Sequence, residues 1–184
     1  MHTDPKDPNG QDLTAIMNNL GLVNGEVYLS TQKVPPEQMA LYYNMADCTI
    51  NISDAEGFGL ATLESLSCGT PIIVNMTGGL QEQVISGAEM FGVPLLPSSK
   101  AIIGSQDVPY IYEDYVSNET IANSIYKLYS LSPEEKEALS KKVKEYTDFE
   151  FKMEDTINDW DETLNECIQS FKQGKYKFWN CEEL

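Results

Sequence analysis

Residues 50–74 of this 184-residue chain read INISDAEGFGLATLESLSCGTPIIV, and this stretch decides the fold. Continuous apolar runs near its two ends predict buried strands at residues 48–52 and 71–74. Between them, a loop at residues 53–59 leads into a helix over residues 61–68, which Gly69 ends. A helical crossover between two strands predicts that they are parallel neighbours in one sheet.

The rest of the chain continues this alternation. Apolar spacing and helix-start signals predict further helices at residues 11–20, 36–46, 80–86, 118–129, 133–146 and 150–173, and short strands at residues 26–30, 93–96 and 110–112. The pattern predicts an α/β fold, with a Rossmann-like parallel sheet, helices on both faces and ligands beyond the carboxyl ends of the strands. We expect a single domain over residues 1–184, with a loop at 1–10, an α/β core at 11–146 and a C-terminal helix and tail at 147–184.

The composition excludes several classes of function. The net charge of −17 argues against nucleic acid and anionic membranes as partners. All 12 basic residues are lysines and His2 is the only histidine, which argues against an arginine phosphate clamp, a serine–histidine triad and a histidine metal site. The four cysteines form no C-x-x-C pair, which favours free thiols in a reducing compartment. No apolar run is long enough to span a bilayer, and we expect a cytoplasmic location.

The glycine-rich loop at residues 53–59 has the features of an anion site. Gly57 and Gly59 let the backbone approach a ligand without an intervening side chain. The helix that follows directs its free N–H groups and the positive end of its dipole to the same place. Glu56 precedes the turn and Glu64 lies about one turn into the helix, so both carboxylates can face one cleft.

These residues resemble the donor-site motif of the retaining GT-B glycosyltransferases of the GT4-like family (glycosyl transferases group 1). Two glutamates separated by seven residues, here Glu56 and Glu64, stand in a pattern that begins EGFGL and continues to CGTP at residues 68–71. The segments LYYNMAD at residues 41–47 and TGGLQE at residues 77–82 also fit the family in order and spacing. The resemblance covers roughly residues 20–170 and implies the C-terminal, nucleotide-sugar-binding half of a GT-B fold.

The resemblance also implies a role for each motif residue. Glu56 would be the catalytic residue near the reacting sugar carbon, and Glu64 would bind the ribose hydroxyls. The donor sugar and diphosphate would be held by the backbone of Gly57, Phe58, Gly59 and Leu60. Candidates for the lining of the cleft are Thr31, Gln32, Gly78 and Gly79. From the residues alone, Glu64 could instead only stabilise the helix dipole, and Gly78 and Gly79 could form only a turn.

The implied function is the transfer of a hexose from a UDP- or GDP-hexose to an unknown acceptor, with retention of configuration and with no metal or other cofactor. The family's donor domain normally begins with a strand–helix–strand unit that carries a Gly-Arg loop and a lysine, and the resemblance leads us to expect that this unit and the N-terminal acceptor domain are missing here. We therefore expect a missing domain or subunit as its partner, and an isolated chain that is inactive or hydrolyses its donor slowly. The alternative is a non-catalytic nucleotide-sugar-binding module, or a subunit of a split transferase.

Three features lie outside the donor motif. Residues 97–114 form a longer insert than the family usually has, and their place makes them a candidate for influencing acceptor or sugar choice. In the family the last helix crosses back to the N-terminal domain, so we expect exposed aromatic side chains among Phe171, Phe178 and Trp179. The sequence from Asp159 to Asp161 matches a D-x-D metal motif, but it lies in an acidic amphipathic helix and is interpreted as a solvated face.

Overall fold

The computed structural model describes residues 1–8 and 10–175, and the chain divides into two compact units, Met1–Met39 and Ala40–Leu184. The first unit contains helix α1 (Leu13–Leu20). Its N-cap is Asp12, whose carboxylate accepts a hydrogen bond from the Ala15 amide, and it ends at Gly21 in the left-handed conformation (φ 73°). Helix α2 (Pro36–Met45) begins in the first unit and ends in the second, as the sequence predicted within one residue.

The predicted strand at residues 26–30 is wrong. In the described part of the chain this segment makes only an isolated parallel bridge, between His2 and Ser30. The carboxylate of Glu26 accepts a 2.7 Å hydrogen bond from the Asn24 amide, which closes a local turn. Such local side-chain bonds compete with the pairing that a strand needs.

The second unit is built on a parallel sheet. Strands β1 (Thr49–Asn51), β2 (Ile72–Asn75) and β5 (Val93–Leu95) pair in the order β1-β2-β5, with Thr49 opposite Ile72 and Ile73 opposite Val93. Helix α3 (Leu60–Ser67) connects β1 to β2. Helix α4 (Leu80–Val84) and the small hairpin of β3 (Ile85–Ser86) and β4 (Glu89–Met90) connect β2 to β5. The predicted α/β fold with a parallel sheet is confirmed.

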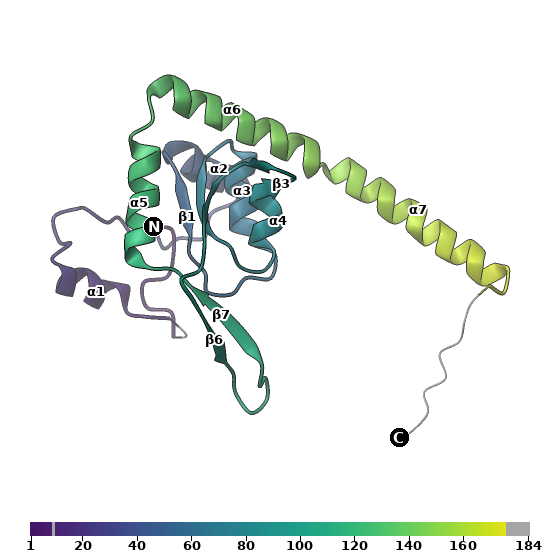
Figure 1. Cartoon of the computed structure of the whole chain (residues 1–184), viewed down its shortest axis with the longest axis horizontal. Helices are drawn as coiled ribbons and strands as arrows, with labels where there is room; N and C mark the ends of the chain where they lie inside the picture. The colour runs from purple at the N-terminus through teal and green to yellow at the C-terminus, as the bar shows by residue number, and fades with distance from the viewer. Residues whose placement is uncertain (9, 176–184) are drawn as a thin grey trace. The chain divides into compact units, whose positions relative to one another are not determined.

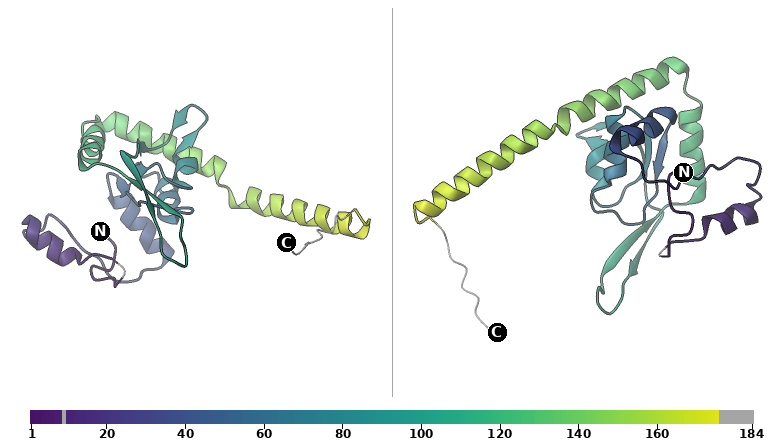
Figure 2. Two further views of the ribbon diagram at one scale, coloured as in Figure 1. Left: turned by 60° about the horizontal axis from the view of Figure 1, so that its bottom comes forward. Right: turned by 180° about the vertical axis from the view of Figure 1, so that it is seen from behind.

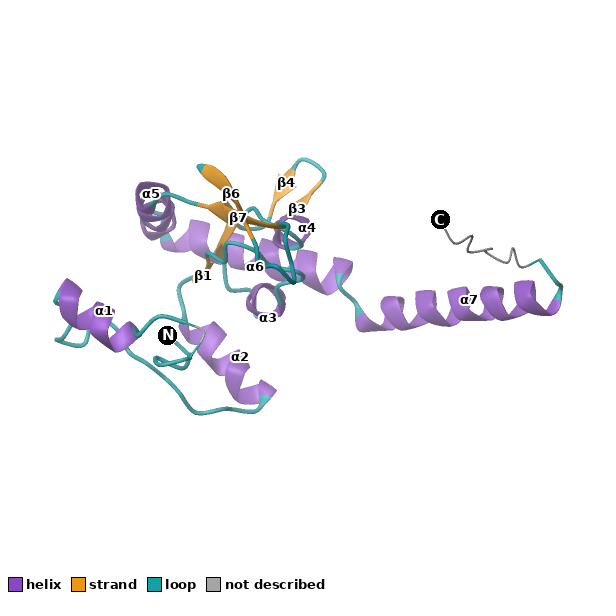
Figure 3. Ribbon diagram, turned by 90° about the horizontal axis from the view of Figure 1, so that it is seen from below, coloured by secondary structure: helices purple, strands orange, loops and turns teal. Residues whose placement is uncertain are grey.

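Helices cover both faces of this sheet, as Figures 1 and 3 show. Ile72 and Val74 of β2 pack on one face in a cluster with Leu66 of α3 and with α4 and α6 (Pro133–Glu150). Ile73, between them, points to the opposite face and packs with Leu128 of α5 (Asn118–Tyr129). The alternation of side chains along β2 thus builds two cores, and all four residues of this strand are buried.

The expectation that residues 48–52 form a buried strand is wrong in one respect. The segment pairs in parallel with β2 as predicted, but β1 is an edge strand whose other edge pairs with no strand in the described residues. Ile50 is 45% exposed and Ile52 is 49% exposed. Helix α5 contacts β2 and β5, so β1 has less helical cover on the face that Ile50 shares with Ile73.

The insert at residues 97–114 forms a β-hairpin, where the sequence predicted a polar segment before a short strand at residues 110–112. Strands β6 (Ser99–Ile103) and β7 (Ile111–Tyr115) pair antiparallel, from Ser99 opposite Tyr115 to Ile103 opposite Ile111. Figure 2 shows the hairpin projecting from the end of the sheet in two further views.

The C-terminal helices begin near their predicted positions. Ser132 caps α6 in a capping box with Glu135, and Pro133 is its first residue. Helix α7 (Met153–Lys172) buries none of its residues, and Phe171 is 65% exposed. The expectation for Phe178 and Trp179 lies outside the described residues. Within the described part of the chain, no helix is both long enough and apolar enough to cross a membrane.

Candidate functional site

The glycine-rich loop lies at the carboxyl end of β1 and is held at both ends by one side chain. Asn51, the last residue of β1, accepts a 3.1 Å hydrogen bond from the Ser53 amide. The amide nitrogen of the same side chain donates to the Thr62 hydroxyl at 3.1 Å, in the first turn of α3. The strand end and the helix start therefore fix the loop between them.

The two glycines of this loop have different roles. A Cβ at Gly57 would meet no atom within 4 Å, so the backbone there is open to a ligand. Gly59 is buried and adopts φ 86°, and a Cβ on it would come closer than 3.0 Å to the Leu80 side chain. Close approach of a ligand to Gly57 stays a prediction, whereas Gly59 is required by packing and by its backbone conformation.

Helix α3 starts directly after this loop, and Gly59 is its N-cap with no side-chain hydrogen bond to the helix. The Thr62 amide donates a 3.0 Å hydrogen bond to the Gly59 carbonyl, so the amides that could meet an anion are those of Leu60 and Ala61, where the helix dipole also favours negative charge. This geometry is compatible with an anion site at residues 57–60, which stays a prediction.

The loop at residues 77–79 packs directly on the first loop. The Gly79 amide donates a 3.2 Å hydrogen bond to the Gly57 carbonyl. A Cβ on Gly78 would come closer than 3.0 Å to the carbonyl oxygen of Glu56, and a Cβ on Gly79 would also come closer than 3.0 Å to the carbonyl oxygen of Gly57. The missing side chains of Gly78 and Gly79 therefore let the two loops meet, and their place in the lining of the cleft stays a prediction.

The two glutamates of the motif are placed differently. Glu56 is half-buried within the loop, whereas Glu64 is exposed on α3. The Tyr43 hydroxyl, from α2, donates a 2.8 Å hydrogen bond to Oε2 of Glu64. Burial raises the pKa of Tyr43 well above its usual value, and the bond to the Glu64 carboxylate raises it further, so the phenol remains a donor.

Sequence reasoning missed Tyr43, and it also missed a polar cluster that joins the hairpin to the loops. The buried Asn75 side chain donates to the carbonyls of Ser53 at 2.9 Å and Asp114 at 2.7 Å. The Asp114 carboxylate accepts a 2.9 Å hydrogen bond from the Thr77 hydroxyl. The backbone amide of Asp114 donates a 2.7 Å hydrogen bond to the Asp54 carbonyl. A polar residue at the end of a buried strand, as Asn75 is, was the available signal.

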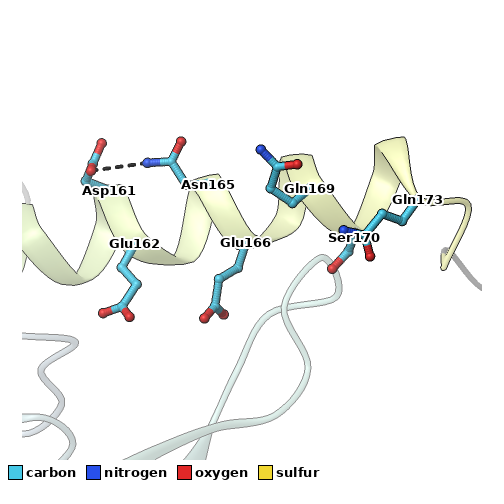
Figure 4. Close-up of a pocket in the computed structure, with 7 residues that line it drawn as sticks. All are labelled: Asp161, Glu162, Asn165, Glu166, Gln169, Ser170 and Gln173. Carbon is cyan, nitrogen blue, oxygen red and sulfur yellow. Dashed lines mark hydrogen bonds between the residues drawn. The ribbon is translucent and has the colours of Figure 1, made fainter.

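Other sequence candidates belong to other parts of the chain. Thr31 and Gln32 belong to the first unit, and their contribution to the cleft stays a prediction. The segment from Asp159 to Asp161 lies within α7, and the described residues contain no cluster of His, Cys, Asp or Glu placed to hold a metal ion. An open depression on α7 is lined by acidic and amide side chains, among which Asn165 donates a 3.2 Å hydrogen bond to Asp161 (Figure 4). None of these residues belongs to the glycine-rich loops.

Comparison with known proteins gives one family and several relatives. The model of the family described as "Glycosyl transferases group 1" matches residues 15–146, well over half of the chain. A D-inositol 3-phosphate glycosyltransferase of Acidothermus cellulolyticus is 36% identical over 75 residues, which are 41% of this chain and 16% of the relative. A second, from Catenulispora acidiphila, is 29% identical over 109 residues, which are 58% of this chain and 25% of the relative. The chain thus spans a quarter or less of these curated relatives.

Solved structures share the fold. A sucrose-phosphate synthase from Thermosynechococcus elongatus aligns with a TM-score of 0.69 and 23% identity, over 89% of this chain and 37% of that protein. HepE from Anabaena, in complex with UDP and glucose, aligns with a TM-score of 0.63 and 20% identity, over 84% of this chain and 36% of that protein. The parallel sheet and its helices are therefore those of GT-B glycosyltransferases.

Proposed function

Because the chain belongs to the glycosyl transferases group 1 family, we propose that it is the donor-binding part of a glycosyltransferase. The donor is a UDP- or GDP-hexose, and the sugar is transferred with retention to an acceptor that the chain alone does not identify. The observation that carries this proposal is the meeting of two glycine loops at the carboxyl end of the sheet, with the uncapped start of α3 between the two glutamates.

In the proposed site, three parts of the chain bind different parts of the donor. The first amides of α3 and the open backbone at Gly57 receive the diphosphate and sugar hydroxyls. Glu64, further along the helix, accepts hydrogen bonds from the ribose hydroxyls. Glu56, in the loop before the helix, contacts the sugar near its reacting carbon.

The reaction that this arrangement serves is a displacement at the anomeric carbon. The bond from that carbon to the β-phosphate oxygen breaks, and its electron pair leaves with the nucleoside diphosphate. The acceptor hydroxyl bonds to the same face of the sugar, and its proton passes to the phosphate oxygen that leaves. Negative charge builds up on the leaving diphosphate, where amides fixed before the reaction stabilise it without reorganisation. The scheme assigns no step to a metal ion.

Binding of UDP and GDP to the 184-residue chain, before and after Glu64→Gln, tests the proposal. UDP is the first probe because HepE, which shares the fold, was solved with it. The loss of one charge-assisted hydrogen bond costs about 1.5–3 kcal/mol, or roughly a 10- to 150-fold loss of affinity. Calorimetry measures this change, and NMR titration replaces it where the affinity is millimolar.

Glu119→Gln is the matched control, because Glu119 is an exposed acid in the first turn of α5, a different helix. It should leave nucleotide affinity unchanged. If Glu64 served only the helix dipole, Glu64→Gln would cost less than about 1 kcal/mol of stability and leave binding alone. Equal affinities of the folded wild type and Glu64→Gln would remove Glu64 from the site, and the absence of any binding to UDP and GDP would overturn the donor role.

The proposal includes a partner domain or subunit that orients the acceptor. Helix α7 supports this, because it carries Trp160, Leu164 and Phe171 on its surface with exposed fractions of 63%, 53% and 65%. Without that partner no second substrate is held beside the reacting carbon. We therefore expect the isolated chain to bind a nucleotide but to transfer no sugar, and robust transfer by residues 1–184 alone would contradict this.

A further inference from the structure

The geometry points to Tyr43 as a positioning residue: its phenol holds the Glu64 carboxylate in the orientation that meets the ribose of the donor. This inference rests on the proposed donor site. Tyr43 lies at the end of α2 and Glu64 in the middle of α3, so the 2.8 Å hydrogen bond from the Tyr43 hydroxyl to Oε2 of Glu64 joins two different helices.

The hydrogen bond leaves Glu64 free to bind a ligand. An ionised carboxylate offers about four lone-pair positions on its two oxygens. The phenol occupies one of them, and Oε1 and the second position on Oε2 can accept the two ribose hydroxyls. A long, exposed glutamate loses rotamer freedom when it binds. Because Tyr43 already restricts the side chain, part of that loss occurs on folding and not on binding.

Tyr43 can fix Glu64 because Tyr43 is itself held to the far end of α3. Its carbonyl accepts a 2.8 Å hydrogen bond from the hydroxyl of Thr70, which is 4% exposed. The Thr70 amide donates to the Ser65 carbonyl at 3.0 Å, and the Ser65 hydroxyl donates back to the Thr70 carbonyl at 3.1 Å. The turn that ends α3 thus holds the backbone of Tyr43, while the phenol reaches the carboxylate in the same helix.

Tyr43 could instead serve only to pack α2 against α3. Binding measurements with two nucleotides distinguish this structural role from the positioning of Glu64. Affinity is measured for UDP and for 2′,3′-dideoxy-UDP, which lacks both ribose hydroxyls. We expect Tyr43→Phe, which keeps the ring and removes the hydroxyl, to weaken UDP binding about three- to tenfold. It should leave the binding of the dideoxy nucleotide unchanged. In a Glu64→Gln background, Tyr43→Phe should add little further loss.

Tyr126→Phe is the matched control, since Tyr126 is 69% exposed on α5 and its variant removes the same hydroxyl. A second measurement needs no nucleotide: carbon-13 NMR follows the ionisation of the Tyr43 phenol. Because the Glu64 carboxylate helps to raise the pKa of Tyr43, the pKa should fall in Glu64→Gln. An unchanged pKa would show that the two side chains are not joined in solution, and would overturn the inference.

The outcomes separate this inference from the proposed function. If Glu64→Gln weakens UDP binding and Tyr43→Phe does not, the positioning role is wrong and the donor site stands. If Tyr43→Phe weakens UDP and dideoxy-UDP equally, Tyr43 is structural only and the inference is again overturned. If neither UDP nor GDP binds, or Glu64→Gln has no effect on binding, the proposed site is wrong and the inference is wrong with it.

Discussion

Replacing Gly79 with alanine would place a methyl group in the backbone contact that joins the two loops of the candidate site. The new Cβ would lie closer than 3.0 Å to the Gly57 carbonyl oxygen and 3.2 Å from the Phe58 Cα. Backbone atoms cannot swing aside as the tip of a side chain can, so the loops must separate. Overpacking of this kind costs about 1–3 kcal/mol, and the hydrogen bond from the Gly79 amide to the Gly57 carbonyl is worth about 0.5–1.5 kcal/mol more.

One effect opposes this cost. Gly79 has φ −67° and ψ −15°, which alanine adopts without strain. Alanine lowers the conformational entropy of the unfolded chain, and this stabilises the variant by about 0.4–1 kcal/mol. The net expectation is a loss of about 2 kcal/mol, or roughly 4–8 °C in the unfolding midpoint of a chain this long. Urea and thermal unfolding followed by circular dichroism measure it.

Gly57→Ala is the control, because a Cβ there meets no atom within 4 Å. It adds the same methyl group to the loop on the other side of the contact and should change stability by less than about 0.5 kcal/mol. Equal stabilities of Gly79→Ala and Gly57→Ala would refute the close contact between the loops, and with it the geometry of the candidate site.

Three further changes probe the core and the hairpin. Leu66→Ala should cost about 2–5 kcal/mol in urea unfolding, because Leu66 is fully buried in the α3–α6 core; a cost below 1 kcal/mol would contradict that packing. Asn75→Ala removes both bonds of a buried amide and should cost about 1–3 kcal/mol, with faster hydrogen exchange at the Asp114 amide; unchanged exchange would show that the hairpin is held otherwise. The hydrogen bond from Tyr115 to Glu113, more than burial, raises the pKa of Tyr115 from 10.0 to about 12. This raised pKa stabilises the fold fully below about pH 10 and ceases to do so as the pH rises through about 12; carbon-13 NMR should find a pKa nearer 10.0 in Glu113→Gln, and no change would disprove the pairing.

The parts of the fold that the sequence predicted are those where local signals agree with the packing. Ile72 to Val74 form a continuous apolar run, and this run lies at the centre of the sheet. Ser132 and Pro133 mark the start of α6 by capping chemistry that needs no tertiary contact. The wrong predictions concern segments whose pairing or burial depends on the elements packed beside them. Ile50 belongs to an apolar run that is typical of a buried strand, but it lies on an edge strand and is partly exposed.

The same distinction applies to the candidate site. The glycines and glutamates of the motif are recognisable by their spacing along one loop and one helix. The partners that fix them come from distant segments: Tyr43 reaches Glu64 across 21 positions, and Asn75 reaches Asp114 across 39. No periodicity encodes such pairs, because the choice between two adjacent tyrosines, or among several polar residues in an insert, depends on the packed positions of the helices and the hairpin.

The charge of the chain leads us to expect that the proposed donor site binds a nucleotide better than it transfers the sugar. In the proposed site, the start of α3 would meet the diphosphate with a partial positive charge of about +0.5, whereas breaking the sugar–phosphate bond adds negative charge that full cations stabilise better. The hairpin anchored to these loops does carry a lysine, Lys100, but this lysine is paired with Asp114 at 3.5 Å and so already faces a carboxylate. The chain as a whole has a net charge of −17 and contains no arginine. We therefore expect a partner that completes the enzyme to contribute basic side chains at the leaving phosphate as well as the acceptor site.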